Sequence, residues 1–189
     1  MKLLLKSSTN TLKTRMPKLS LRLETIAALV PFGARVCDIG TDHGYLAIEL
    51  IKSKKAKSVI AADIGEKPLL NAKKNITAAN IDGIELRLCD GLSGIKNGET
   101  DTVIIAGMGG EVISGILENG KEVARCGDIS FILQPTTSPE HLRRYLFENG
   151  YTIESETPLC ENGKLYSVML VKYIDSSLEK SEREKTDKR

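Results

Sequence analysis

Short apolar runs alternate along the chain with longer segments in which apolar residues recur every three or four positions. The first longer segment, residues 19–30, has its apolar residues on one side, at Leu23, Ile26, Ala27 and Val30. This spacing predicts an amphipathic helix. Ser20 is a suitable N-cap for it, and Pro31 with Gly33 would end it.

Alternating strands and helices are predicted for the centre of the chain. Apolar runs of strand length lie at residues 35–39, 58–63, 84–89, 101–106 and 129–134. Helical patterns separate them at residues 45–52, 66–80, 110–119 and 138–149, the last opening with a cap and a proline, Ser138-Pro139. This alternation predicts a parallel sheet with helices on both faces.

The end of the folded region has a different pattern. Residues 151–158 and 165–173 are two extended runs, and Asn162-Gly163 between them is a strong signal for a tight hairpin turn. A dinucleotide-binding domain would be expected to continue with further strand-helix units. A terminal hairpin on such a sheet is instead typical of the S-adenosylmethionine methyltransferase variant. We therefore predict an α/β, Rossmann-like fold of the class I methyltransferase type. Its sheet would have seven strands, mostly parallel, with a C-terminal antiparallel hairpin and helices on both faces.

Charge divides the chain into three parts. Residues 1–18 carry five basic and no acidic residues, and we expect a basic, disordered arm there. Residues 19–174 form the expected methyltransferase domain and carry a net charge of −3, whereas the charged tail at 175–189 is neutral overall. Because neutralising phosphates needs clustered cations, any nucleic-acid binding must use the arm or a local patch.

The composition of the chain indicates in which cell compartment the protein is expected and whether a metal site is expected. No apolar run approaches the roughly 18–20 residues that a membrane-spanning helix needs, and the start of the chain lacks an apolar stretch of secretory length. Four cysteines are present without a C-x-x-C pair, and two of them, Cys37 and Cys89, fall in predicted strands. The two histidines are far apart. We expect a cytoplasmic protein with reduced thiols, no membrane association and no metal site.

Acidic residues gather at the first predicted strand end. The run D-I-G-T-D-H-G holds Asp38, Asp42 and His43, with Gly40 permitting a tight turn and close approach of a ligand to the backbone. In an open parallel sheet, ligands bind at the carboxyl ends of the strands. A pyrophosphate would be repelled by two acids, whereas S-adenosylmethionine carries an ammonium and a sulfonium. The alternative is a structural turn with solvated acids.

The other strand ends supply further candidates. Asp63 lies 25 residues after Asp38, a spacing that suits binding of ribose hydroxyls or an N-cap role in the next helix. Asp90-Gly91 is either an adenine contact or an ordinary turn.

Gly107 and Met108 follow the fourth strand, where Met108 packs on a cofactor or in the core. Gln134 and Thr136 are expected at a rim where substrate enters, or in a capped loop.

Together these blocks resemble one family. D-I-G-T-D-H-G-Y-L, A-A-D-I, D-G-L, I-I-A-G-M-G-G and L-Q-P, with the leading L-S-x-R-L helix, resemble the bacterial tRNA (adenine-22-N1)-methyltransferases, the TrmK family, over residues 19–173. The resemblance implies S-adenosylmethionine as cofactor, tRNA as partner and N1-methyladenosine in the D-arm as product. The chain departs from the family at Thr136, where asparagine is usual. The family's C-terminal helical domain, which helps to hold tRNA, is expected to be missing.

The resemblance also implies roles for single residues. Asp38, Gly40 and His43 would surround the methionine end of the cofactor, and Gly107 with Met108 would flank the reaction site. Ribose and adenine would contact the second and third strand ends, at Asp63, Ile64, Asp90 and Gly91. Asp42 would lie nearest catalysis. Substrate would contact Arg22, Gln134 and Thr136, with Arg22 as the candidate for a tRNA contact.

Methylation of adenine N1 needs little from a catalytic base, because N1 already has an in-plane lone pair. The hypothesis for Asp42 is that its carboxylate stabilises the positive charge that develops on the adenine. The competing interpretation is that Asp42 hydrogen-bonds loop amides. Two other functions stay open, namely methylation of another RNA or a small molecule, and cofactor binding without catalysis.

Overall fold

A computed structural model describes residues 18–126 and 128–174. The predicted tail at 175–189, and all of the predicted arm except Lys18, lie outside these residues. The strands are β1 (Ala34–Ile39), β2 (Ala56–Asp63), β3 (Ile84–Leu88), β4 (Thr102–Gly109), β5 (Ser130–Thr137), β6 (Tyr151–Glu161) and β7 (Lys164–Tyr173). The helices are α1 (Leu21–Leu29), α2 (Tyr45–Lys52), α3 (Glu66–Ala79), α4 (Gly110–Asn119), α5 (Lys121–Ala124) and α6 (Pro139–Glu148).

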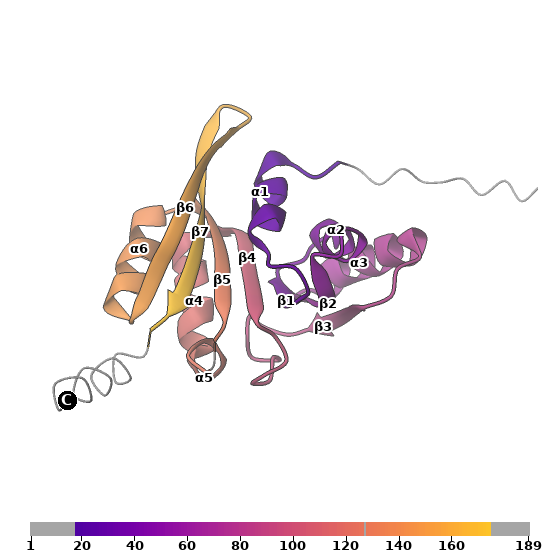
Figure 1. The fold of residues 1–189 in the computed structure, drawn as a ribbon, viewed down its shortest axis with the longest axis horizontal. Coiled ribbons are helices and arrows are strands. Elements are labelled where there is room, and N and C mark those ends of the chain that lie inside the picture. Colours follow the sequence, from indigo (N-terminus) through magenta and orange to yellow (C-terminus); the bar gives the residue numbers. More distant parts are fainter. Residues whose placement is uncertain (1–17, 127, 175–189) are drawn as a thin grey trace, which may run out of the picture.

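The described strands form a single sheet with the order β3-β2-β1-β4-β5-β7-β6 (Figure 1). Strands β1 to β5 pair with one another in parallel, and β7 runs antiparallel to both β5 and β6. The predicted fold class is therefore confirmed. The strand order reverses between β1 and β4, and such a switch point opens a crevice at the carboxyl ends of the two strands.

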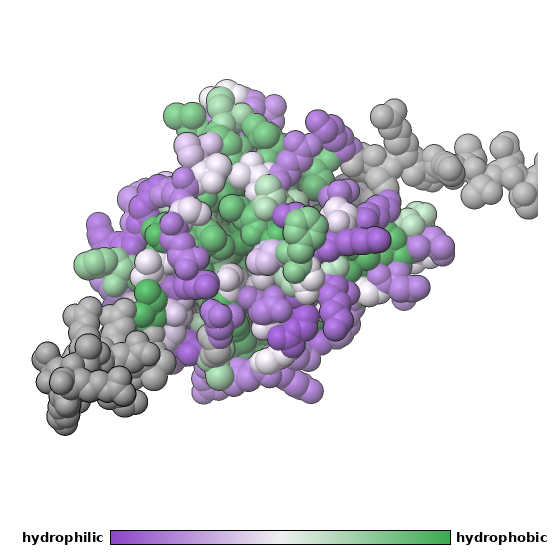
Figure 2. All heavy atoms as spheres, viewed as in Figure 1, coloured by the Kyte–Doolittle hydropathy of each residue, from purple (hydrophilic) through white to green (hydrophobic). Residues whose placement is uncertain are grey.

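The core has one layer on each face of the sheet. Buried residues of α1 and α2 pack on one face, where Val36, Ile104 and Ile132 point from β1, β4 and β5. Buried residues of α4 and α6 pack on the other face, against strand residues of the alternate register such as Phe131. Because successive residues of a strand point to opposite faces, each central strand is apolar on both sides. Figure 2 shows hydrophobic residues near the centre of one view of the molecule, with hydrophilic ones around them.

The hairpin of β6 and β7 turns at the predicted Asn162-Gly163, where both residues have positive φ angles, 51° and 74°. This conformation matches the right-handed twist of the two strands. Only the Ser130–Leu133 part of β5 pairs with β7, so the rest of the hairpin extends past the end of the sheet. Its outer part lies beside α1 (Figure 1), and Glu161 at the end of β6 bonds to Arg22 in α1.

Several local expectations differ from the structure. Strands β4 and β5 continue to Gly109 and Thr137 through two register shifts, because the backbone keeps pairing after Ala106. Cys89 lies just beyond β3, not within it, and the short helix α5 has no counterpart in the prediction. The side chain of Ser20 caps α1 as expected. Ser138 precedes α6 in a left-handed conformation, and its side chain makes no capping bond.

Candidate active site

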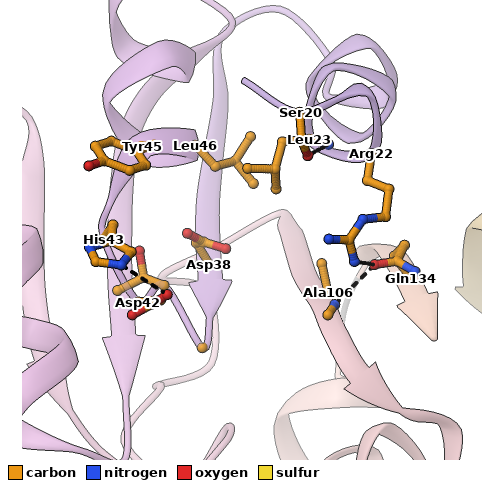
Figure 3. Close-up of a pocket in the computed structure, with 13 residues that line it drawn as sticks. Ser20, Arg22, Leu23, Asp38, Asp42, His43, Tyr45, Leu46, Ala106 and Gln134 are labelled. Carbon is orange, nitrogen blue, oxygen red and sulfur yellow. Dashed lines mark hydrogen bonds and ion pairs between the residues drawn. The ribbon is translucent and has the colours of Figure 1, made fainter. Parts of the chain in front are cut away.

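The candidate site lies at the carboxyl end of the sheet, on the face that α1 and α2 cover. Asp38 is two residues after Val36 in β1, and Gln134 is two residues after Ile132 in β5. The period of two in a strand therefore places both side chains on the face of α1 and α2, above its apolar core. A pocket of about 310 Å³ opens there between the loop after β1, the first turn of α1 and the ends of β4 and β5 (Figure 3).

Seven of the predicted site residues line this pocket: Arg22, Asp38, Gly40, Asp42, His43, Gly107 and Gln134. They come from α1, from β1 and its loop, and from β4 and β5. The pocket thus joins chain segments more than 100 residues apart, such as Arg22 and Gln134. The clustering follows from the switch point, where the carboxyl ends of β1 and β4 are neighbours.

Asp38 carries the strongest electrostatic signal of the pocket. Its side chain sits at the end of β1, and the residue is 5% exposed. Burial raises the pKa of Asp38 to about 6, the Thr41 hydroxyl opposes the rise, and the charge of Asp63 adds to it. The Thr41 hydroxyl is near enough to the carboxyl to act on its pKa, but within the described residues its geometry does not make a full hydrogen bond. A buried carboxylate with a raised pKa gains most from a cationic ligand.

The loop after β1 is held against β2 and β4. The backbone amides of Gly40 and Thr41 both donate to the carbonyl of Ala62, at 2.8 and 3.1 Å. Gly40 has a φ angle of +78°, and a Cβ atom there would overlap the methyl group of Met108. The positive φ angle therefore favours glycine at the turn, whereas the overlap involves only the flexible end of the Met108 side chain.

Asp42 and His43 form the outer wall of the pocket. Asp42 has a φ angle of 47°, and its side chain is 65% exposed. His43 Nε2 lies 3.4 Å from Asp42 Oδ2, and the His43 ring stacks on Tyr45 with centroids 5.4 Å apart. Within the described residues, no hydrogen bond joins the Asp42 carboxylate to a loop amide. The structure therefore gives no support to the competing interpretation of Asp42 as a loop brace.

Gln134 connects the ends of three elements. Its side-chain oxygen accepts hydrogen bonds from the Gly107 amide of β4 at 3.1 Å and from Arg22 Nη1 of α1 at 3.4 Å. Gln134 is only 1% exposed. It was expected at the rim where substrate enters, and its side chain forms a buried part of the pocket wall.

The other predicted residues lie outside the pocket lining. Asp63 ends β2 and accepts a hydrogen bond from the Gly65 amide through Oδ1, at 2.8 Å. Gly65, not Asp63, is the N-cap of α3. Next to it, Ile64 is 70% exposed, and Asp90 is exposed after β3. Since β1, β2 and β3 are successive neighbours, these residues lie along the same edge of the sheet as the pocket.

Three further expectations concern Gly91 after β3, Met108 in β4 and Thr136 in β5. A Cβ atom on Gly91, which has a φ angle of +53°, would lie 3.0 Å from Ile116 of α4. Met108 packs against the core on the α4 side, in line with the core alternative. Thr136 donates to the Met108 carbonyl at 3.0 Å and so fastens β5 to β4.

Pocket residues without a predicted role are Ser20, Leu23, Thr41, Tyr45, Leu46 and Ala106. Apolar periodicity assigned Leu23 to a helix face, and that face forms one wall of the pocket. Thr41 and Tyr45 flank residues that had been singled out, so their position in the loop was the available signal.

Within residues 18–126 and 128–174, no helix is long and apolar enough to cross a membrane. The same residues contain no cluster of three or more metal-ligating acid, histidine or cysteine side chains.

A mostly parallel sheet with a terminal antiparallel hairpin, and an acid-lined pocket at its switch point, define the class I methyltransferase type of domain. The methyltransferase domain family matches residues 19–169. The chain belongs to this family and, within it, to the TrmK group that the motifs resemble.

Two relatives support this placement. The tRNA (adenine(22)-N(1))-methyltransferase of Bacillus subtilis is 41% identical over 159 residues, which are 84% of this chain and 66% of the relative. The crystal structure of B. subtilis TrmK superimposes with a TM-score of 0.79, covering 84% of this chain and 68% of that one. A Streptococcus pneumoniae protein in complex with S-adenosyl-L-methionine is 36% identical, with a TM-score of 0.78 over 85% of this chain and 77% of that one. The chain thus spans about two thirds of the curated relative.

Proposed function

We propose that this protein is an S-adenosylmethionine-dependent RNA methyltransferase that methylates N1 of adenine 22 in the D-arm of tRNA. The observation that carries the proposal is the buried carboxylate of Asp38, in a pocket at the switch point of a methyltransferase sheet. Its relative from B. subtilis is named for this reaction, and its relative from S. pneumoniae binds S-adenosyl-L-methionine. A tRNA substrate also accounts for the expected cytoplasmic location.

The pocket fits the charged end of this cofactor. Asp38 would accept from the ammonium group, because an ion pair offsets the cost of keeping a carboxylate away from water. Gly40, His43 and Gly107 line the same pocket and would surround the methionine chain, with Met108 packed beneath the Gly40 turn. An anionic pyrophosphate would instead face two acids in one loop, Asp38 and Asp42, and would be repelled.

The nucleoside part of the cofactor would lie along the neighbouring strand ends. Asp63 uses Oδ1 for the turn amide of Gly65, which leaves Oδ2 for ribose hydroxyls. The exposed side chain of Ile64 offers an apolar surface for the adenine ring. Asp90 and Gly91 would meet the amino edge of that ring, since β3 is the next strand along.

The cofactor, when bound, supplies a methyl group on a positively charged sulfur. The protein must hold adenine N1 in line with that methyl group and exclude water. Asp42 is placed at the open side of the pocket, with a carboxylate whose described partner is the His43 imidazole. There it would accept from the target amino group and stabilise the positive charge that develops on the adenine.

Substrate contacts are expected on the β4 and β5 side of the pocket. Gln134 is buried at the pocket wall and would act through the groups it holds, Gly107 and Arg22. Thr136 fastens the end of β5 to β4 beside the opening. Extracting a base from a folded RNA costs a few kcal/mol, which binding of the surrounding tRNA must supply. Since residues 19–174 carry a net charge of −3, that binding needs a local basic surface.

A methyl-transfer assay tests the proposal. The protein would be incubated with labelled cofactor and a tRNA transcript that has adenine at position 22, and the nucleosides would be analysed by mass spectrometry. We expect N1-methyladenosine from this transcript and none from a matched transcript with guanine at position 22. Methylation of the guanine variant or of another RNA would support the alternative substrate. Cofactor binding without any transfer would support a binding module.

A further inference from the structure

Strand β3 forms one edge of the sheet, because within the described residues it pairs only with β2 (Figure 1). Gly83 and Cys89, which directly flank β3, both bond to the backbone of β2. Backbone groups alternate in direction along a strand, so the amides and carbonyls of Ile84, Leu86 and Leu88 face away from β2. They form a row of donors and acceptors with which another strand can pair.

The same three residues line an apolar groove beside α3. The groove has a volume of about 530 Å³ and lies between β3 and the side chains of this helix. Leu70 of α3 and Leu88 at the end of β3 both line it and are 56% and 54% exposed. A contiguous apolar surface of this kind marks an interaction site, whereas single exposed leucines do not. The edge thus offers unpaired backbone groups and an apolar surface together.

The sequence of β3 lacks the residues that commonly keep edge strands from pairing. Lysine and proline serve this purpose in many sheets, and I-E-L-R-L contains neither. Its two charged residues, Glu85 and Arg87, have opposite signs and project from the other face of the sheet, where Arg87 Nε donates to Glu85 Oε1 at 2.9 Å. Arg87 Nη1 also donates to Glu99 Oε2 at 2.7 Å, which fixes the guanidinium. A strand with this charge order is complementary to its own reverse.

We propose that two copies of this chain associate through β3, in an antiparallel pair with Leu86 opposite Leu86 on a two-fold axis. In this register Ile84 of one copy lies opposite Leu88 of the other, so all three outward-facing residues form hydrogen-bonded pairs. Glu85 of each copy lies opposite Arg87 of the other copy, in the non-hydrogen-bonded positions where side chains are closest. One register therefore satisfies the backbone groups and the charges together.

Other registers of the same strand pair are disfavoured. A shift by two residues places either Glu85 opposite Glu85 or Arg87 opposite Arg87, and like charges directly opposite each other destabilise a strand pair. A shift by one residue leaves the outward-facing amides without acceptors and turns the apolar side chains to the wrong face. In the proposed register both α3 helices lie on one face of the joined sheet, so the two apolar grooves face each other across the new strand pair.

The association leaves the pocket of each copy open. The pocket lies at β1 and β4, and β2 separates these strands from β3. Because the two-fold axis reverses the direction of the strands, the carboxyl ends of the two sheets, and with them the two pockets, lie at opposite edges of the joined sheet. The inference concerns a surface outside the candidate active site and does not depend on the proposed function.

Sedimentation velocity of the full chain at increasing concentration tests for the pair. We expect the 20.7 kDa chain to double its mass as the concentration rises from the micromolar to the submillimolar range. Glu85→Lys places like charges opposite each other twice in the pair, so its dissociation constant should rise about tenfold or more. The Glu85 side chain is 59% exposed, so the fold tolerates this change. Glu148→Lys is the control, an exposed residue at the end of α6, and it should associate as the wild type does.

Cysteine cross-linking tests the register. Residues in a hydrogen-bonded antiparallel pair have Cα atoms about 5.5 Å apart, a separation that a disulfide can bridge. Leu86→Cys should therefore form a covalent dimer when a mild thiol oxidant is added, since residue 86 meets itself on the axis. Leu88→Cys is the matched control with the same four native cysteines, because the two copies of residue 88 lie about 14 Å apart.

Four outcomes would overturn the inference. The first is a monomer at every concentration, and the second is a dimer that Glu85→Lys leaves unchanged, which would place the interface elsewhere. The third is cross-linking of Leu88→Cys but not of folded Leu86→Cys. The fourth is slow hydrogen exchange of the β3 amides that does not depend on protein concentration, which would show that a segment of the same chain covers the edge. Circular dichroism would verify folding, and Glu85→Lys decides alone if a cysteine variant does not fold.

Discussion

The side-chain oxygen of Gln134 accepts a hydrogen bond from the backbone amide of Gly107 across the ends of β5 and β4, at 3.1 Å. The strand register shifts at this point, between Ala106 and Met108, so the Gly107 amide lacks a regular ladder partner there. Gly107 itself is exposed, so this bond contributes the net energy of an ordinary hydrogen bond and not the larger cost of a buried, unpaired amide. The same oxygen also accepts from Arg22, which joins the wall of the pocket to α1.

Replacing Gln134 should therefore destabilise the protein and loosen the pocket. We expect Gln134→Met, which keeps the length of the side chain, to lower the free energy of unfolding by about 0.5–1.5 kcal/mol, the net contribution of an ordinary hydrogen bond. Urea unfolding followed by circular dichroism would measure this. Gln134→Glu keeps an acceptor oxygen and should lose less at pH values where the carboxylate is ionised. An unchanged midpoint in Gln134→Met would show that the bond contributes nothing.

Cofactor binding should depend on pH through Asp38. Its pKa of about 6 means that the free protein is protonated at this position below pH 6 and ionised above it. Since an ammonium group binds the carboxylate form, affinity should rise as pH increases to 6 and then level off. Below pH 6 we expect a loss of up to about tenfold per pH unit, measured by calorimetry. Asp38→Asn should bind weakly, without this pH dependence.

The same carboxylate should reduce the stability of the free protein at neutral pH. The pKa of Asp38 is higher in the folded state, about 6, than its ordinary value of 3.8. The folded protein therefore holds more protons between these pH values, and stability falls as pH rises through this window. Asp38→Asn removes the buried charge and should gain up to about 3 kcal/mol above pH 6. Melting curves at pH 4 and pH 8 would test this, with no gain expected at pH 4.

Asp42 should affect methyl transfer far more than cofactor binding. We choose Asp42→Asn because asparagine tolerates the positive φ angle of this position, 47°. The rate of methylation should fall by about 100-fold or more, because the developing charge on the adenine loses its counter-charge. Calorimetry should give a nearly unchanged affinity for S-adenosylmethionine. Asp82→Asn, outside the pocket, is the control. Equal losses of binding and transfer would contradict a catalytic role.

Alanine at Gly40 should destabilise the protein, and a double variant can show whether overlap with Met108 is the cause. Gly40 and Gly98 have nearly equal φ angles, +78° and +81°, so alanine is strained at both. Only the Cβ atom at Gly40 would overlap Met108, whereas nothing lies within 4 Å at Gly98. We expect Gly40→Ala to lose up to about 1 kcal/mol more than Gly98→Ala in chemical unfolding, because the overlapping Met108 methyl group is the end of a flexible side chain. Adding Met108→Ala should recover part of that difference, and no recovery would contradict the overlap as the cause.

Much of this architecture could be predicted from local patterns. The alternation of apolar runs and helical segments, with Asn162-Gly163 between two extended runs, determined the parallel sheet and its terminal hairpin. These signals are local, because strand period, helix period and turn chemistry depend on neighbouring residues. The acids at the first strand end were also visible, since Asp38 lies near the end of a clear strand pattern and Asp42 lies in the loop that follows it.

The tertiary structure decided what those residues face. Burial is the main cause of the raised pKa of Asp38, and burial depends on α1, α2 and the neighbouring strands together. The depth of Gln134 and the continuation of β4 and β5 depend on pairing between segments nearly 30 residues apart. The contact of Arg22 with Glu161 spans 139 residues and has no local signal. The sequence alone therefore determined the elements and the loop chemistry, whereas long-range packing decided which charges meet in the pocket.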